Sequence, residues 1–143
     1  MNLSTKTYNE LYREARMQGV SRLEATELLL AATSKRKPEL IRDFALSARL
    51  EVAARFRELL ERRVSGEPLA YILGEWDFYG LTLEVTPDVL IPRSDSEPLV
   101  DAALAALTTR RSAADSADAL DSADALDRAK PARVLDLCCG SGC

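Results

Sequence analysis

The 143-residue sequence contains no histidine, and its three cysteines all lie among the last six residues. A structural zinc site normally takes four nitrogen or sulfur ligands, with paired cysteines about two to four residues apart. Cys138 and Cys139 are adjacent, so we expect no metal site, and three clustered thiols cannot staple a fold. We interpret Cys138, Cys139 and Cys143 as small apolar residues of a tight loop, with a free-thiol redox role as the weaker alternative.

Long apolar runs are also missing, because no stretch approaches the ~20 residues that cross a bilayer. The first residues show no apolar segment behind a basic start, so the sequence predicts no secretory signal. We therefore expect a cytoplasmic, monomeric protein that does not associate with membranes.

The net charge of −4 is unevenly distributed. Residues 1–66 hold 13 Lys and Arg against 9 Asp and Glu, a balance of +4, whereas residues 67–143 hold 6 against 14, a balance of −8. Mixed charges along amphipathic helices usually form a solvated face, and we favour that interpretation and expect no direct contact with nucleic acid. The alternative is that the basic half faces an acidic partner, such as ribosomal RNA or an acidic protein surface.

Residues 1–66 predict a small bundle of helices. The Ser-Arg-Leu-Glu sequence at residues 21–24 fits a capping box, and Pro38 suits the first turn of another short helix. From Ser47 on, apolar residues recur in steps of three and four, which predicts a helix with one buried stripe. The stripe consists of Leu50, Ala53, Phe56, Leu60 and Val64.

Gly66 and Pro68 break the helical pattern, and aromatic and β-branched residues follow them. This composition predicts a β-hairpin, with Gly80 in its turn, inside a linker of residues 67–93.

A second capping box is expected at residues 94–97, Ser-Asp-Ser-Glu, before a helix of about three turns. The acidic hexamer Asp-Ser-Ala-Asp-Ala-Leu then occurs twice, at residues 115–120 and 121–126. We assign no chemistry to this low-complexity insert, residues 112–129, and expect a solvated, poorly ordered connector.

The sequence closes with a short apolar run, residues 133–137, followed by Cys-Cys-Gly-Ser-Gly-Cys. The run has the composition of a buried parallel strand, and Gly140 and Gly142 let backbone N–H groups approach a ligand as a strand turns into a helix. A nicotinamide-binding Rossmann turn is one interpretation of this pattern. Because the sequence stops inside the motif, we expect a fragment or a truncated reading frame.

Six segments occur in an order and spacing shared with one enzyme family. They are Gly66-Glu-Pro-Leu-Ala-Tyr-Ile72, Gly74, Phe78-Tyr-Gly80, Leu90-Ile-Pro-Arg93, Glu97 and Asp136-Leu-Cys-Cys-Gly-Ser-Gly142. Together they resemble the protein-(glutamine-N5) methyltransferases, specifically the peptide chain release factor methyltransferases. Residues 66–93 are the most specific part, and they favour this family over a nicotinamide-binding protein.

The resemblance implies an α + α/β fold in three parts. Residues 1–66 would be a helical bundle that recognises the release factor, residues 67–93 a hairpin linker, and residues 94–143 the start of a Rossmann-like methyltransferase domain. The implied reaction is S-adenosylmethionine-dependent methylation of a glutamine side-chain amide, in a Gly-Gly-Gln-type sequence, which modulates translation termination.

The same resemblance implies which residues bind the cofactor. They are Asp136, Cys138, Cys139, Gly140, Ser141 and Gly142. Arg93 and Glu97 are further candidates; the alternative is that Arg93 anchors the linker and that Glu97 caps a helix.

The family orients the glutamine amide with an Asn-Pro-Pro-Tyr motif that this sequence does not contain. We therefore assign no catalytic residue and expect the chain alone to be inactive. Cys138 and Cys139 stand where glycine and threonine are more usual, and they resemble relatives that act on a ribosomal protein, so that substrate stays an alternative. A noncatalytic remnant that binds a release factor or the ribosome is a second alternative.

Overall fold

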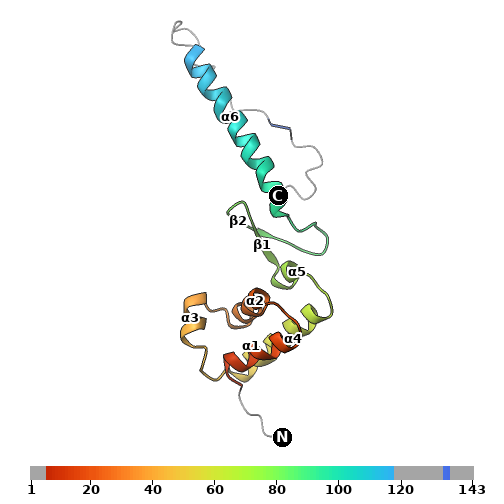
Figure 1. The fold of residues 1–143 in the computed structure, drawn as a ribbon. Coiled ribbons are helices and arrows are strands. Elements are labelled where there is room, and N and C mark those ends of the chain that lie inside the picture. The colour runs from red at the N-terminus through yellow and green to blue at the C-terminus, as the bar shows by residue number, and fades with distance from the viewer. Residues whose placement is uncertain (1–5, 118–133, 136–143) are drawn as a thin grey trace. The chain divides into compact units, whose positions relative to one another are not determined.

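The computed structural model describes residues 6–117 and 134–135 (Figure 1). The chain divides into two compact units. The helical unit comprises Met1–Glu75 and Glu84–Pro87, and the second unit comprises Trp76–Leu83 and Asp88–Cys143. The helical unit is therefore discontinuous in sequence, because most of a hairpin interrupts it.

Helix α1 spans Tyr8–Met17 and begins with a capping box that the sequence analysis did not identify. The Glu10 N–H donates to Thr7 Oγ1 at 3.2 Å, and the Thr7 N–H donates to the Glu10 carboxylate at 2.7 Å. These bonds satisfy backbone donors that have no partner inside a helix. At the other end, Gly19 has a φ of +84°, a left-handed conformation that stops the helix at little cost in a residue without Cβ.

Helix α2 spans Arg22–Thr33, and its predicted capping box is confirmed. The Glu24 N–H donates to Ser21 Oγ at 3.2 Å, and the Ser21 N–H donates to the Glu24 carboxylate at 2.9 Å. The short helix α3 spans Lys37–Arg42, with Pro38 in its first turn as predicted. Proline is favoured there because the missing N–H would have had no helical partner.

Helix α4 spans Leu50–Val64 and carries the predicted apolar stripe, although the ends of the stripe are not buried. Ala53, Phe56 and Leu60 are buried, whereas Leu50 and Val64 are about half exposed. Leu59, which the stripe omitted, is 1% exposed. The apolar face in the middle of the helix is therefore wider than a single line of residues.

Helix α5 spans Leu69–Leu73, a segment that the sequence analysis assigned to the hairpin linker. That assignment of secondary structure was wrong because two flanking residues set the backbone. Pro68 is the N-cap of the helix, and Gly74, with a φ of +81°, ends it. Tyr71 and Ile72 favour strands on propensity, but Ile72 is 6% exposed here, and its burial in the helical core overrides that propensity.

One hydrophobic core fills the helical unit, with α2 and α4 as the most extensively packed pair. Its members come from α1, α2, α3, α4, α5 and their connections: Tyr8, Leu11, Ala15, Val20, Ala25, Leu28, Leu29, Leu40, Ala48, Ala53, Phe56, Leu59, Leu60 and Ile72. Tyr12 packs edge-on against Phe44 at its border, with the ring centroids 5.6 Å apart.

Strands β1, Glu75–Phe78, and β2, Leu81–Glu84, pair as the predicted hairpin. The turn residues are Tyr79 and Gly80, with φ values of +49° and +75°. Two positive φ values are the requirement of the two-residue turn whose twist matches that of the strands. Gly80 was the predicted turn residue. Tyr79 also adopts a positive φ, although its Cβ makes that conformation less favourable than it is for glycine.

The predicted capping box at residues 94–97 does not form. Residues Ser94–Ser96 make a 3-10 turn, and helix α6 runs over Glu97–Ala117. The Glu97 carboxylate accepts a hydrogen bond from the Tyr79 N–H instead of closing a cap. The helix is 21 residues long rather than about three turns, because the alanine-rich start of the insert continues it. Residues 112–117 are thus helical, and the rest of the insert lies outside the described residues.

The described part of the expected strand over residues 133–137 is Val134 and Leu135. They are 67% and 81% exposed and belong to no strand. The Rossmann-like domain stays a prediction. In the part of the chain that the structure describes, no helix is both long and apolar enough to cross a membrane.

Candidate functional site

The Gly-Glu-Pro sequence at residues 66–68 forms the junction between α4 and α5. Gly66 has a φ of +100°, and its N–H donates to the Arg63 carbonyl at 3.1 Å, while the Glu67 N–H donates to the Arg62 carbonyl at 3.1 Å. These two bonds close the end of α4 in a Schellman motif. Pro68 then starts α5, so the three residues stop one helix and begin the next without an intervening loop.

An ion pair reinforces this junction. The Arg62 Nε donates to the Glu67 carboxylate at 2.8 Å, and a second Arg62 nitrogen donates to the other carboxylate oxygen at 2.5 Å. The same guanidinium reaches the Tyr71 carbonyl at 3.4 Å, so it ties α4 to α5. The hydrogen bonds from Arg62 hold the pKa of Glu67 below its ordinary value. The start of the stretch that carries the predicted resemblance, residues 66–93, therefore forms a helix junction with a fixed geometry.

Arg63, the next residue of α4, connects the junction to α2. Its Nε donates to the Glu24 carboxylate at 2.8 Å, across 39 residues of sequence. Hydrogen bonds from Ser21 and the charge of Arg63 lower the pKa of Glu24. Arg62 and Arg63 lie off the predicted apolar stripe, and periodicity alone does not show which carboxylates lie opposite them.

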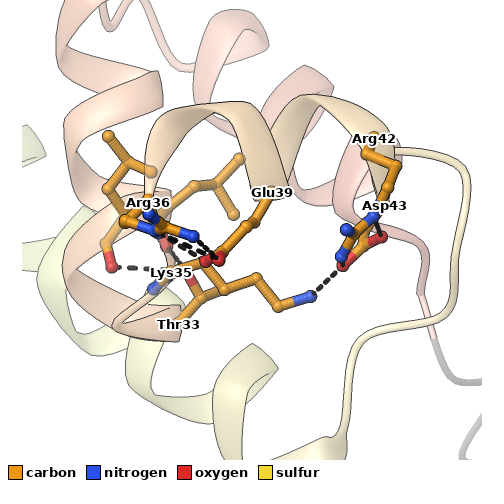
Figure 2. Close-up of polar contacts among 8 residues, drawn as sticks. Thr33, Lys35, Arg36, Glu39, Arg42 and Asp43 are labelled. Carbon is orange, nitrogen blue, oxygen red and sulfur yellow. Dashed lines mark hydrogen bonds and ion pairs between the residues drawn. The ribbon is translucent and has the colours of Figure 1, made fainter.

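A second charged cluster surrounds α3 (Figure 2). The Asp43 carboxylate accepts from Arg42 Nε and from Lys35 Nζ, each at 2.8 Å. The Lys35 ammonium also lies 4.7 Å from the centroid of the Tyr8 ring. Arg42 and Lys35 hold the pKa of Asp43 well below its ordinary range. Since these charges satisfy one another and link α1, the connection between α2 and α3, and the end of α3, we assign the cluster a structural role.

The surface of the helical unit has a groove of about 340 Å³ between α1 and α4. It is lined by Glu14, Gln18, Arg57, Leu60, Glu61, Val64 and Ser65. Leu60 is buried and Val64 is 49% exposed, so the groove combines an apolar floor with a charged rim.

The rim is held in place by a bridging carboxylate. Glu14 accepts from Lys6 Nζ at 2.5 Å and from Arg57 Nε at 3.3 Å. Partial burial opposes ionisation of Glu14, but Lys6 and Arg57 outweigh it, and the pKa of Glu14 is lowered. A rim fixed in this way around an apolar floor is suited to an apolar side chain of a protein partner.

In the second unit, the structure brings the candidate Glu97 against the hairpin turn. Its carboxylate accepts from the Tyr79 N–H at 3.1 Å, and the Tyr79 hydroxyl donates to the Asp101 carboxylate at 2.6 Å. The hydrogen bond to Asp101 raises the pKa of Tyr79. Arg93 is exposed at the N-cap of the 3-10 turn, where its carbonyl accepts from the Ser96 N–H at 2.9 Å. The sequence analysis included Tyr79 in the Phe78-Tyr-Gly80 segment but predicted no contact for its side chain.

The predicted cofactor residues Asp136, Cys138, Cys139, Gly140, Ser141 and Gly142 lie outside the described residues, and their role stays a prediction. Among residues 6–117 and 134–135, no group of three or more His, Cys, Asp or Glu side chains could hold a metal ion.

Part of the helical unit is similar to a known domain family. Residues 11–74 match the family model of the PrmC N-terminal domain. The predicted resemblance is confirmed. The matched region runs from within α1 to the end of α5 and contains both the groove and the Gly-Glu-Pro junction.

Curated relatives extend the match. A protein of Pseudomonas aeruginosa named release factor glutamine methyltransferase is 47% identical over 83 residues, which are 57% of this chain and 30% of that protein. A protein of the same name from Nitratidesulfovibrio vulgaris is 41% identical over 88 residues, 62% of this chain and 23% of that protein. The human MTRF1L release factor glutamine methyltransferase is 40% identical over 86 residues, 60% of this chain and 22% of that protein. The matched part of the chain thus spans less than a third of the length of these relatives.

Proposed function

We propose that this protein takes part in the S-adenosylmethionine-dependent methylation of a glutamine side-chain amide in a peptide chain release factor. The observation that carries the proposal is the PrmC N-terminal domain match over residues 11–74, together with relatives named release factor glutamine methyltransferase. The order of the segments over residues 66–97 supports the same assignment.

In this proposal the helical unit recognises the release factor. It has its own core, and the groove between α1 and α4 has an apolar floor at Leu60 and Val64 inside a rim of fixed charges. A groove on a rigid scaffold suits specific recognition, since little conformational freedom is lost on binding. The domain boundaries at residues 66 and 93 and the monomeric state belong to the proposal as well.

The cofactor would be held by Asp136 and by the loop from Cys138 to Gly142. Backbone donors and a carboxylate are suited to the amino acid end of S-adenosylmethionine, which carries an ammonium and a carboxylate. When bound, the cofactor supplies the electrophilic methyl group.

The first test is the binding of a purified release factor to the 143-residue chain by isothermal titration calorimetry. We expect saturable binding to the wild-type chain and a loss of about tenfold or more in affinity for Val64→Glu, which places a charge on the groove floor. Leu50→Glu is the matched control, because Leu50 is on the same helix and is 52% exposed, close to the 49% of Val64. Equal affinities for the two variants would contradict the groove as the recognition site, and no binding by any of the three proteins would contradict the recognition role.

A second assay separates catalysis from binding. Transfer of a labelled methyl group from S-adenosylmethionine to the release factor would support the enzymatic role. Binding without transfer would instead favour a noncatalytic recognition module, which the self-contained core of the helical unit also supports. Replacing the release factor with ribosomal protein tests the remaining alternative substrate.

A further inference from the structure

The hairpin turn places a tyrosine where the backbone favours another residue. Tyr79 has a φ of +49°. A left-handed conformation disfavours a residue with Cβ, and Asn or Gly is the usual choice at this position of a two-residue turn. A conformation of this kind persists when surrounding contacts hold it.

Two hydrogen bonds provide those contacts. The Tyr79 N–H donates to the Glu97 carboxylate at 3.1 Å, and the Tyr79 hydroxyl donates to the Asp101 carboxylate at 2.6 Å. Glu97 and Asp101 are four residues apart on α6 and so lie on one face of the helix. The turn is therefore fastened to α6 at both the backbone and the far end of the side chain.

An asparagine at position 79 would adopt the positive φ with less strain, but its shorter side chain could not reach the Asp101 carboxylate.

An isolated two-stranded hairpin is at best marginally stable in water. Leu81, the first residue after the turn, is 63% exposed, so the hairpin presents an apolar side chain that its own unit does not bury. Binding residues are commonly found on loops that a rigid scaffold holds in position.

We propose that Tyr79 is a positioning residue: through Glu97 and Asp101 it holds the turn of the hairpin on α6, so that Leu81 is presented to the protein substrate. This role rests on the proposed function, whereas the attachment itself does not. The attachment is defined by the three side chains of Tyr79, Glu97 and Asp101, and it consists of the two hydrogen bonds described above.

The attachment is tested first, by amide hydrogen exchange of the 143-residue chain without any substrate. Tyr79→Phe and Asp101→Asn each weaken the same bond, so we expect exchange of the amides of residues 76–83 to accelerate by about threefold to tenfold in each. The double variant should add little to either single variant, since the two changes remove one interaction. Tyr79→Asn should also exchange faster than wild type, although asparagine suits the turn. Asp88→Asn, an exposed carboxylate of the same unit, is the control and should match wild type.

A spectroscopic signature distinguishes this bond from a general loss of structure. In an absorbance titration, the phenol that Tyr79→Phe removes should have a lower pKa in Asp101→Asn than in wild type, and Asp88→Asn should leave that pKa unchanged. Wild-type exchange rates in Tyr79→Phe and Asp101→Asn, or fully additive effects in the double variant, would overturn the attachment.

Binding of the release factor then tests the positioning role. We expect Tyr79→Phe and Asp101→Asn to weaken the affinity by about threefold to tenfold, with Asp88→Asn unchanged. If both variants loosen the hairpin and bind as well as wild type, the positioning role is wrong. If wild type itself does not bind, the proposed recognition function fails, while the exchange data still decide whether the attachment exists.

Discussion

Substitution of Gly66 by alanine isolates the contribution of one backbone angle to the junction between α4 and α5. Gly66 has a φ of +100°, and a Cβ added to it would meet no atom within 4 Å. The cost is therefore conformational and not a matter of packing. Forcing an L-residue into the left-handed region costs about 1–2 kcal/mol. The smaller entropy of the unfolded alanine chain offsets roughly 0.4–1 kcal/mol of this cost.

We expect Gly66→Ala to lower the free energy of unfolding by about 1 kcal/mol, since the strain exceeds the gain from the unfolded chain. Relaxation of the strain would move the Glu67 N–H away from the Arg62 carbonyl and would add to the loss. With an m-value of roughly 1 kcal/mol per molar urea, the unfolding midpoint should fall by about 1 M. Far-ultraviolet circular dichroism during urea unfolding measures this shift.

Two further substitutions control the experiment. Gly66→Asn should cost less than Gly66→Ala, because asparagine tolerates left-handed backbone. Ser65→Ala changes the neighbouring residue, whose φ of −71° is accessible to any residue, and it removes only the exposed hydrogen bond from Ser65 Oγ to the Arg62 carbonyl at 2.7 Å, so its effect on stability should be smaller than that of Gly66→Ala. An alanine variant at Gly66 that is as stable as wild type would refute the reasoning, since it would mean that the helix does not end in this conformation.

Three other predictions concern the helical unit. Phe56 is fully buried, so Phe56→Ala should destabilise it by about 3–5 kcal/mol, and calorimetry should show a lost or much weakened transition, in contrast to a smaller effect of Phe56→Leu. Ser21→Ala removes the acceptor of the Glu24 N–H and should cost about 1 kcal/mol in urea unfolding; an unchanged midpoint would argue against the capping box. In the folded state the pKa of Glu24 lies below its ordinary value of 4.5. The ionised carboxylate therefore stabilises the fold fully above pH 4.5, and this contribution is lost as the pH falls through the lowered pKa of the folded state. Urea unfolding at several acidic pH values should therefore show a shallower loss of stability for Glu24→Gln than for wild type, and equal slopes would contradict the assignment.

Local signals in the sequence predicted several elements whose ends are set by neighbouring residues, although the equally local capping box at Thr7 and Glu10 was missed. The box at Ser21 and Glu24 involves residues three apart, and Pro38 acts through its own ring, so both could be identified without knowledge of the fold. The hairpin was predicted because Gly80 interrupts alternating residues, and the turn needs little else.

Elements that depend on distant residues were not predicted. Pro68 and Gly74 set the ends of helix α5 locally, but its residues prefer strands, and the burial of Ile72 in a core made by other helices overrides that preference. The expected box at residues 94–97 fails because Glu97 has a partner 18 residues away in Tyr79. A glutamate at the right spacing for a capping box can thus accept a hydrogen bond from a distant residue instead. Sequence spacing does not show which of the two partners the side chain will bind.

The candidate site shows the same division. Residues 66–74 belong to the stretch that carries the resemblance, but their role as a helix junction depends on Arg62 and Arg63, and helical periodicity does not show the partners of these two residues. The groove between α1 and α4 has no sequence signature, because it forms where two helices separated by two others in sequence pack side by side.

The interruption of the helical unit by the hairpin has a practical consequence for dissecting the protein. Val85 lies after the hairpin, is 3% exposed, and donates its N–H to the Gly74 carbonyl at 3.0 Å. A recombinant fragment that stops at Glu75 would lose this residue and leave the Gly74 carbonyl without its backbone donor. A fragment that extends to Pro87 retains both chain segments of the helical unit. A fragment of the helical unit should therefore end no earlier than Pro87.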